Sequence, residues 1–296
     1  MTETVESFID EAFLKNLENF KFASKRGMKG PHRGEHKSWQ SGEGIEFLDY
    51  RKYHLGDDLR YVDWSVYGRL DRLFIKLFHA EENQTVYMLL DTSRSMESGR
   101  PPKHICAKKI VAALSYICLS NLDKIGLACF SEKIDSMKPP VRGKKNYPQI
   151  LSFLVSMKPG QKTTINASFL EFTALCRRRG IVIILSDLFD PNGYEAGLKA
   201  LVYKRFEIHV IHVLDHEELF WSKTGNLMLT EVETGEKKIA FVDRSQLKRY
   251  RRKVEEFITG LQRFCGRYGI NYYLYDTRMA FEDFLMDYFT KSSVLR

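Results

Sequence analysis

The sequence predicts an α/β protein with a doubly wound, mostly parallel sheet, and two observations carry this prediction. From residue 83 onward, short apolar runs of strand length alternate with longer segments of helical periodicity. This alternation is typical of a parallel sheet that is covered by helices on both faces. The run at residues 181–185 is apolar at every position, which indicates a central strand buried on both faces.

The other elements of this part follow from the same two periodicities. Strands are expected at residues 84–90, 125–130, 134–141, 208–214 and 270–275, and helices at 103–122, 146–157, 166–179, 193–204, 245–268 and 280–289. Pro139 and Pro140 restrict the strand 134–141 to an edge of the sheet, because proline has no amide proton to donate.

Two additions complete the predicted architecture. Residues 4–22 have the spacing of an amphipathic helix, and residues 45–80 suggest short strands and turns. A β-hairpin around Thr234-Gly235 interrupts the α/β alternation. We therefore expect an N-terminal part at 1–82 and a Rossmann-like α/β domain at 83–296 with an insertion at about 215–243.

The composition indicates a soluble globular protein. Apolar residues make up 44% of the 296 positions, and 46 basic against 38 acidic residues give a net charge of +8. That moderate excess is compatible with an acidic partner without requiring one. No apolar run approaches the roughly 18 residues of a membrane span, and the first residues lack the pattern of a signal peptide. We expect a cytoplasmic protein without a membrane span.

The cysteines argue against a zinc site or a disulfide framework, because they are odd in number and form no Cys-x-x-Cys pair. Most lie in apolar surroundings, which favours buried free thiols. They are Cys106, Cys118, Cys129, Cys176 and Cys265.

The sequence Asp-Thr-Ser-Arg-Ser at 91–95 is the strongest candidate for a functional site. Asp91 ends the first predicted strand, and Ser93 and Ser95 follow in the turn before a helix. Ligands of open α/β sheets bind at the carboxyl ends of the strands. A carboxylate with two hydroxyls offers hard oxygen ligands, which suit Mg²⁺ or another divalent cation such as Mn²⁺ or Ca²⁺. The same residues also occur as helix caps.

Two later segments bring further oxygen ligands to the same edge. The loop at 160–167 carries Thr163 and Thr164, and Asp187 follows the buried strand at 181–185. Together with Asp91, Ser93 and Ser95, these positions resemble the metal-ion-dependent adhesion site (MIDAS) of von Willebrand factor type A (vWA) domains.

The resemblance implies a sheet whose first and fourth strands are neighbours, a metal bound by Asp91, Ser93, Ser95, Thr163 and Asp187, and a partner carboxylate that completes the coordination. Thr164 and Asp190 remain alternatives to Thr163 and Asp187. Leu188 stands where the family usually has glycine.

The segment ahead of the sheet resembles a bacterial family, the domain of unknown function 58. The matching motifs are G-E-H-K-S at 34–38, G-E-G-I-E-F at 42–47, D-Y-R-K-Y-H-L-G-D-D-L-R-Y-V-D-W at 49–64 and R-L-D-R-L-F-I-K-L-F at 69–78, followed by D-x-S-x-S-M. This resemblance implies a vWA-like protein that works with a MoxR-type AAA+ ATPase in assembly or maturation of client proteins.

The charged motif at 49–64 has two interpretations. Its alternating charges suit an ion-pair network that orders a segment with little apolar content. Arg60 and Trp64 could instead form a partner-binding surface, since these residue types are common in binding hot spots.

Two other functions fit parts of the sequence. The helix at 244–268 carries eight basic residues against Glu255 and Glu256, which suits nucleic acid but also a solvated helix face. A metal-dependent hydrolase is the second alternative. No Ser-His-Asp arrangement, His-Glu-x-x-His motif or Walker-type loop stands in the sequence, so we expect a protein-binding module that is not an enzyme and has no catalytic residue.

Overall fold

The computed structural model describes residues 46–79, 84–158, 163–176, 178–230 and 237–292. The described residues before 83 belong to one compact unit and those from Gln84 onward to another. Each unit is described by itself. The helix predicted at 4–22 and the motifs at 34–38 and 42–45 lie outside the described residues.

The smaller unit is a two-stranded antiparallel sheet with one helix. Strand β1 (Glu46–Lys52) pairs with β2 (Phe74–His79), and a 3-10 turn, η2 (Leu59–Tyr61), precedes helix α2 (Trp64–Leu70). The prediction of only strands and turns was wrong for α2, which is too short to show a periodic pattern.

Asp63 fixes the beginning of α2. Its carboxylate accepts the N–H groups of Ser65 and Val66, which have no partner within the helix. Asp71 ends the helix in the left-handed conformation. Local capping therefore forms this helix where an amphipathic pattern is missing.

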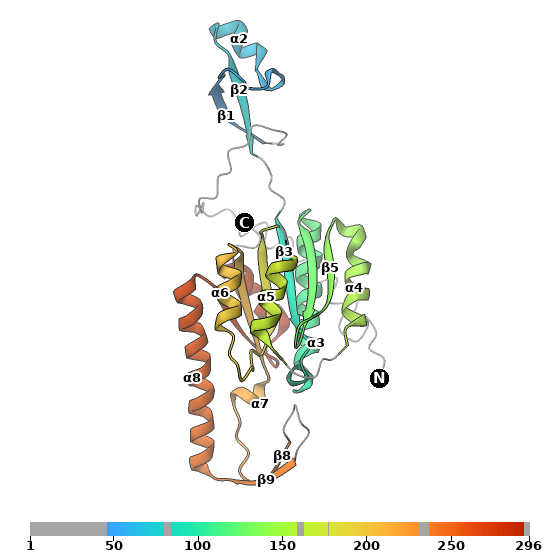
Figure 1. Ribbon diagram of the computed structural model, residues 1–296, viewed down its shortest axis with the longest axis vertical. Coiled ribbons are helices and arrows are strands. Elements are labelled where there is room, and N and C mark those ends of the chain that lie inside the picture. Colours follow the sequence, from blue (N-terminus) through green and yellow to red (C-terminus); the bar gives the residue numbers. More distant parts are fainter. Residues whose placement is uncertain (1–45, 80–83, 159–162, 177, 231–236, 293–296) are drawn as a thin grey trace. The chain divides into compact units, whose positions relative to one another are not determined.

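The larger unit contains a six-stranded sheet with the order β10-β7-β6-β3-β4-β5 (Figure 1). The strands are β3 (Thr85–Asp91), β4 (Lys124–Phe130), β5 (Ile134–Arg142), β6 (Ile181–Ser186), β7 (Glu207–Leu214) and β10 (Asn271–Asp276). All neighbours are parallel except β4 and β5. The predicted α/β fold class is confirmed, with β5 at the edge and the sheet's first and fourth strands, β3 and β6, paired.

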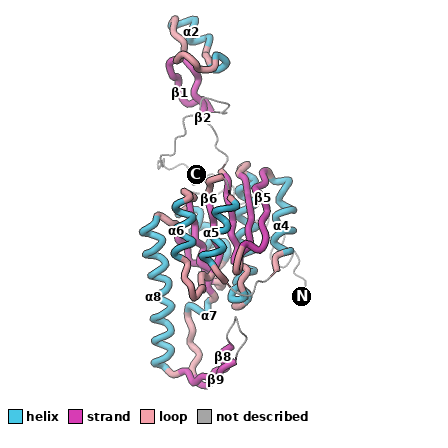
Figure 2. The backbone as a smooth tube through the Cα atoms, viewed as in Figure 1, coloured by secondary structure: helices cyan, strands magenta, loops and turns pink. Residues whose placement is uncertain are grey.

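Helices cover both faces of this sheet (Figures 1 and 2). On one face lie α3 (Lys103–Ser120), α4 (Tyr147–Ser156) and α9 (Phe281–Lys291), and on the other α5 (Ile165–Leu175), α6 (Glu195–Tyr203) and α8 (Arg244–Tyr268). Strand β3 serves both cores because successive side chains point to opposite faces. Met88 joins the first core and Leu89 the second. This double burial explains the uninterrupted apolar runs of the central strands.

An insertion leaves the sheet after β7. It begins with the short helix α7 (His216–Leu219) and continues into an antiparallel pair, β8 (Gly225–Thr230) and β9 (Lys237–Val242). The predicted turn at Thr234-Gly235 lies between these strands and outside the described residues. Asp243 and Gln246 then form a reciprocal cap at the start of α8.

Four of the cysteines are buried and Cys176 is half-buried, all as free thiols. Within the described ranges, no helix combines the length and the apolar character that a membrane crossing requires.

Candidate functional site

Asp91 lies at the carboxyl end of β3, in the middle of the sheet. The register pairs Leu90 with Leu185 of β6, so Asp91 falls beside Ser186 at the ends of two parallel strands. Its carboxylate accepts the Ser93 N–H at 2.8 Å and the Ser186 hydroxyl. The side chain is buried, with 2% of the residue exposed. Both donors are neutral, so neither brings a compensating positive charge.

The two serines of the motif turn their hydroxyls toward each other. Ser93 precedes the 3-10 turn η3 (Arg94–Glu97), which contains Ser95, and the two Oγ atoms lie 3.0 Å apart. Ser93 makes no side-chain capping bond to that turn. The helix-cap alternative therefore does not account for its hydroxyl, and both serines present oxygen atoms close to Asp91.

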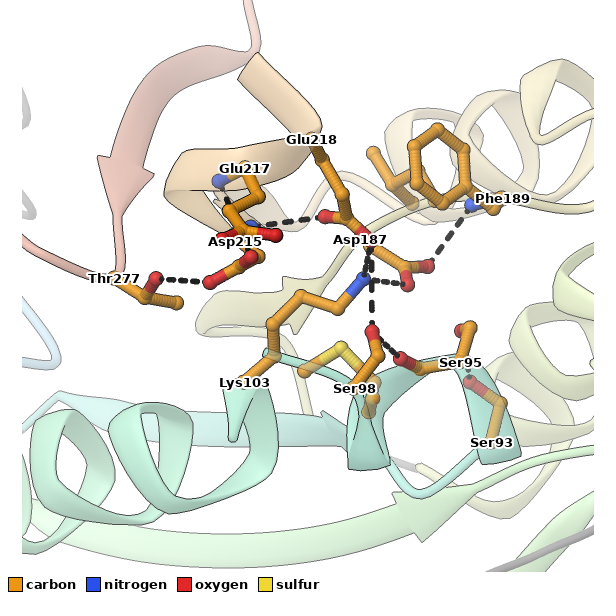
Figure 3. A network of polar contacts seen from close by, with 12 residues as sticks. Ser93, Ser95, Ser98, Lys103, Asp187, Phe189, Asp215, Glu217, Glu218 and Thr277 are labelled. Atoms are coloured by element: carbon orange, nitrogen blue, oxygen red, sulfur yellow. Dashed lines mark hydrogen bonds and ion pairs between the residues drawn. The ribbon is translucent and has the colours of Figure 1, made fainter. Parts of the chain in front are cut away.

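Asp187 lies at the end of β6, as predicted, and binds a residue that the sequence reasoning missed. The Lys103 ammonium is 2.8 Å from Asp187 Oδ2 and 2.7 Å from Glu218 Oε1. Figure 3 shows Lys103 reaching from the start of α3 toward both carboxylates. Lys103 is 0% exposed and Asp187 1% exposed. A buried ion pair thus engages one of the predicted metal ligands.

One signal for Lys103 was present in the sequence. The helix predicted at 103–122 is apolar around most of its circumference, and α3 is in fact buried on nearly all sides. A lysine on such a helix needs an internal anion. Glu218 gave no such signal, because α7 is a single turn in an insertion.

The electrostatics of the site follow from burial and charge. Burial by itself would lower the pKa of Lys103, but the carboxylates of Asp187 and Glu218 raise it above its usual value. Burial, and then the charge of Asp187, raise the pKa of Asp91 to about 7. Burial also raises the pKa of Glu218, against the opposing effect of Lys103. The three carboxylates of this network outnumber its single ammonium, and burial favours the neutral form of Asp91 and of Glu218.

The threonine and the second aspartate are placed by the start of α5. Thr163 is buried two residues before that helix, and Thr164 is half-buried. Asp190 accepts the N–H groups of Ile165 and Asn192, both at 2.8 Å, and so holds the α5 N-terminus. Asp187 is engaged as well, by Lys103 and the Phe189 N–H, so engagement does not separate the two aspartates.

Leu188, which follows Asp187, has a backbone conformation that glycine adopts more readily than other residues. Its φ is 55°, in the left-handed region that normally favours glycine. The Ser186 hydroxyl accepts its N–H at 2.8 Å, and its side chain is buried in the second core. Burial and hydrogen bonding therefore offset the strain, and the glycine-like turn persists without a glycine.

The donor set fits a hard cation in part. Asp91, Ser93 and Ser95 converge, their oxygen chemistry suits Mg²⁺ or Mn²⁺, and the carboxylates outnumber the ammonium. Asp187 is engaged by Lys103 instead. Among the described residues, no group of three or more His, Cys, Asp or Glu side chains forms a metal cluster. The site is thus poor in charge and rich in hydroxyls, and any cation there would keep several waters.

A cavity of about 320 Å³ opens beside Asp91. Its lining mixes acidic, basic and apolar groups from the end of β3, the beginning of α3 and the end of α4: Leu90, Asp91, Thr92, Ser93, Glu97, His104, Ala107, Lys108, Val155, Met157 and Lys158. A partner side chain has room to approach Asp91 and Ser93 from this side.

The charged motif of the smaller unit forms ion pairs. Arg51 binds Asp57 at 2.9 Å and Lys76 binds Asp63 at 3.1 Å. Asp63 also accepts the Tyr50 hydroxyl at 2.8 Å. That hydrogen bond is the main cause that lowers the pKa of Asp63 to about 2. These contacts support the ion-pair interpretation.

Arg60 and Trp64 stay on the surface of the smaller unit. The side chain of Arg60 is 82% exposed, although it pairs with Asp58 at 2.6 Å. Trp64 is 60% exposed and packs edge-on against Tyr67. Both positions are accessible to a partner.

The basic helix α8 is mostly solvated. Only Leu261 and Cys265 are buried among its described side chains. Tyr250 donates to the Glu218 carbonyl at 2.9 Å, and Arg251 donates to the Trp221 carbonyl. The helix therefore contacts the insertion through Tyr250 and Arg251. These contacts give part of its polar face a structural role that does not involve nucleic acid.

Comparisons with known proteins place the chain in a family. A family model described as "Protein of unknown function DUF58" matches residues 49–258. The uncharacterized protein Rv1480 of Mycobacterium tuberculosis is 24% identical over 231 residues, which cover 76% of this chain and 73% of that protein.

Two solved structures resemble the larger part of the chain. The conserved hypothetical protein BatB from Bacteroides thetaiotaomicron is 17% identical, with a TM-score of 0.43, over 71% of this chain and 100% of that one. An aerotolerance-related membrane protein from Bacteroides fragilis is 16% identical, with the same TM-score and the same coverage. The family match covers more than half of the sequence and contains both Asp91 and the charged motif, and on this ground the chain belongs to the DUF58 family of proteins of unknown function.

Proposed function

We propose that this protein is a non-enzymatic protein-binding module that captures a partner carboxylate through a divalent cation held at the carboxyl ends of β3 and β6. Asp91, Ser93, Ser95 and Thr163 would hold the cation, with Asp187 as a direct or water-mediated ligand. When bound, the cation supplies a positive charge with an open coordination position.

The observation that carries this proposal is the environment of Asp91. Among the described residues, this carboxylate, which is 2% exposed, receives hydrogen bonds from neutral donors, and the Ser93 and Ser95 hydroxyls lie 3.0 Å apart in the turn that follows it. Burying a carboxylate without a cation is costly. A hard cation at the hydroxyls would remove that cost, and Asp91 and Ser93 both line the neighbouring cavity.

We further propose that the module works with a MoxR-type AAA+ ATPase in the assembly or maturation of client proteins. This part rests on the family resemblance. The exposed Arg60 and Trp64 would give such a partner a second surface on the smaller unit.

Affinity capture from a lysate tests the function. The full chain is used as bait with Mg²⁺ or with EDTA, beside Asp91→Asn and, as matched control, Asp283→Ala, which removes an exposed carboxylate of α9. We expect partners to be recovered with Mg²⁺ only, lost with Asp91→Asn and retained with Asp283→Ala. Equal recovery with EDTA would refute the metal-bridged mechanism.

A further inference from the structure

Both the main chain and the side chain of Lys103 are fixed by contacts within the protein. It is the first residue of α3, and its N–H donates to the Ser98 carbonyl at 2.9 Å. Its ammonium lies 5.4 Å from the centre of the Phe189 ring and is completely buried. The ammonium can therefore reach solvent only if the start of α3 or its surroundings rearrange.

The ammonium engages one of the two carboxylate oxygens of Asp187. Asp187 Oδ2 accepts from Lys103 at 2.8 Å, while Oδ1 accepts the Phe189 N–H at 3.1 Å. Both oxygens are therefore engaged within the protein. Direct ligation of a cation by Asp187 would bring two positive charges to one carboxylate, where they repel each other strongly because the surroundings are buried.

Glu218 offers the ammonium an alternative anion. Its Oε1 is 2.7 Å from Lys103 Nζ, and its Oε2 accepts the Asp215 N–H at 2.8 Å as part of a reciprocal cap of α7. Tyr250 of α8 donates its hydroxyl to the Glu218 carbonyl. Glu218 is thus held in place by three elements, and Lys103 can remain paired with it if Asp187 is withdrawn.

We propose that Lys103 is a tethered internal cation that competes with the divalent ion for Asp187, while Glu218 retains the ammonium when the ion is bound. This inference rests on the proposed function, because it concerns the same ion. Because of this competition, the divalent ion binds weakly in the absence of a partner. A carboxylate from the partner adds the negative charge that shifts the balance, so ion and acidic partner bind cooperatively.

Mn²⁺ binding to the purified full chain, measured by electron paramagnetic resonance, tests this inference. Lys103→Met should tighten Mn²⁺ binding by at least about fivefold, the lower end of typical coupling between binding events. Glu218→Gln should weaken it, since the ammonium then has Asp187 as its remaining carboxylate in the network. Lys204→Met, at an exposed position after α6, should leave binding unchanged.

Unchanged or weaker binding in Lys103→Met would overturn the inference, as would unchanged binding in Glu218→Gln. If Lys103→Met does not fold in EDTA, Mg²⁺ should restore its thermal unfolding transition, and failure to do so counts against the inference. The proposed function fails separately. If Asp91→Asn binds Mn²⁺ as the wild type does, the ion is held elsewhere, whatever Lys103 does.

Discussion

The Lys103 ammonium lies 2.8 Å from the Asp187 carboxylate, although 84 positions separate the two residues in the sequence and neither side chain is more than 1% exposed. The parallel arrangement of β3 and β6 makes this meeting possible. Helix α3 follows β3 after a connection that contains η3, and Asp187 comes directly after the neighbouring strand β6. A cation supplied by the chain therefore binds one of the two carboxylates that the resemblance to MIDAS sites assigns to a metal.

Removal of the ammonium should destabilise the fold. Lys103→Met leaves Asp187 and Glu218 without their shared counter-ion, and breaking a buried pair in this way costs about 3–5 kcal/mol. Urea unfolding in EDTA measures the loss, with Lys204→Met as control. The double variant Lys103→Met/Asp187→Asn should recover part of the stability. A loss below about 1 kcal/mol would mean that water reaches this pair.

The stability contributed by Asp91 should depend on pH in metal-free buffer. Its pKa is about 7 in the folded protein and about 3.9 in an unfolded chain. Between these values the folded state binds more protons, so this contribution is complete below about pH 4 and is lost as the pH rises through 7. Thermal unfolding in EDTA from pH 5 to 8 should show the wild type falling relative to Asp91→Asn. Parallel profiles would show that Asp91 titrates normally.

Gly180 should not tolerate a side chain. It precedes β6, and a Cβ atom there would collide with the Thr85 carbonyl of the neighbouring strand β3. Gly180→Ala should therefore cost at least about 1–3 kcal/mol, as overpacking does. Gly260→Ala, within α8 and with nothing near its added Cβ, should instead stabilise by about 0.5–1 kcal/mol. Chemical denaturation measures both, and equal effects would contradict the predicted contact.

Asp63 should determine whether the smaller unit stays ordered. Asp63→Ala removes the cap of α2 together with the contacts to Tyr50 and Lys76. A cap alone is worth about 0.5–2 kcal/mol. Amide hydrogen exchange across β1 and β2 should accelerate in this variant and stay unchanged in Lys52→Ala, an exposed position on β1. Unaltered protection in Asp63→Ala would show that the strand pair is stable without the cap.

The sequence was sufficient to predict the strands of the large sheet, because burial on both faces produces an uninterrupted apolar run. The strand at 181–185 is apolar at every position because cores lie on both of its faces, and Pro139 and Pro140 marked the edge strand. Helix α2 left no such pattern, because a capping carboxylate rather than an apolar stripe forms it.

The sequence predicted the positions of those candidate ligands that share one motif or follow a strand of the sheet. Asp91, Ser93 and Ser95 lie within five residues, and strand ends brought Asp187 to the same edge. The partners of Asp187 come from two other segments. Lys103 and Glu218 meet it through tertiary packing, which no local spacing records. The sequence also gave no sign of the left-handed backbone at Leu188, because a leucine does not indicate that conformation.

The most direct test of the central claim is Mn²⁺ binding to the full chain, compared between the wild type and two variants, Asp91→Asn and Ser93→Ala/Ser95→Ala. We expect weak binding by the wild type and loss of binding in both variants, each of which should keep its folded circular dichroism spectrum. Binding that persists in Asp91→Asn and in the double serine variant would contradict a cation site at the end of β3.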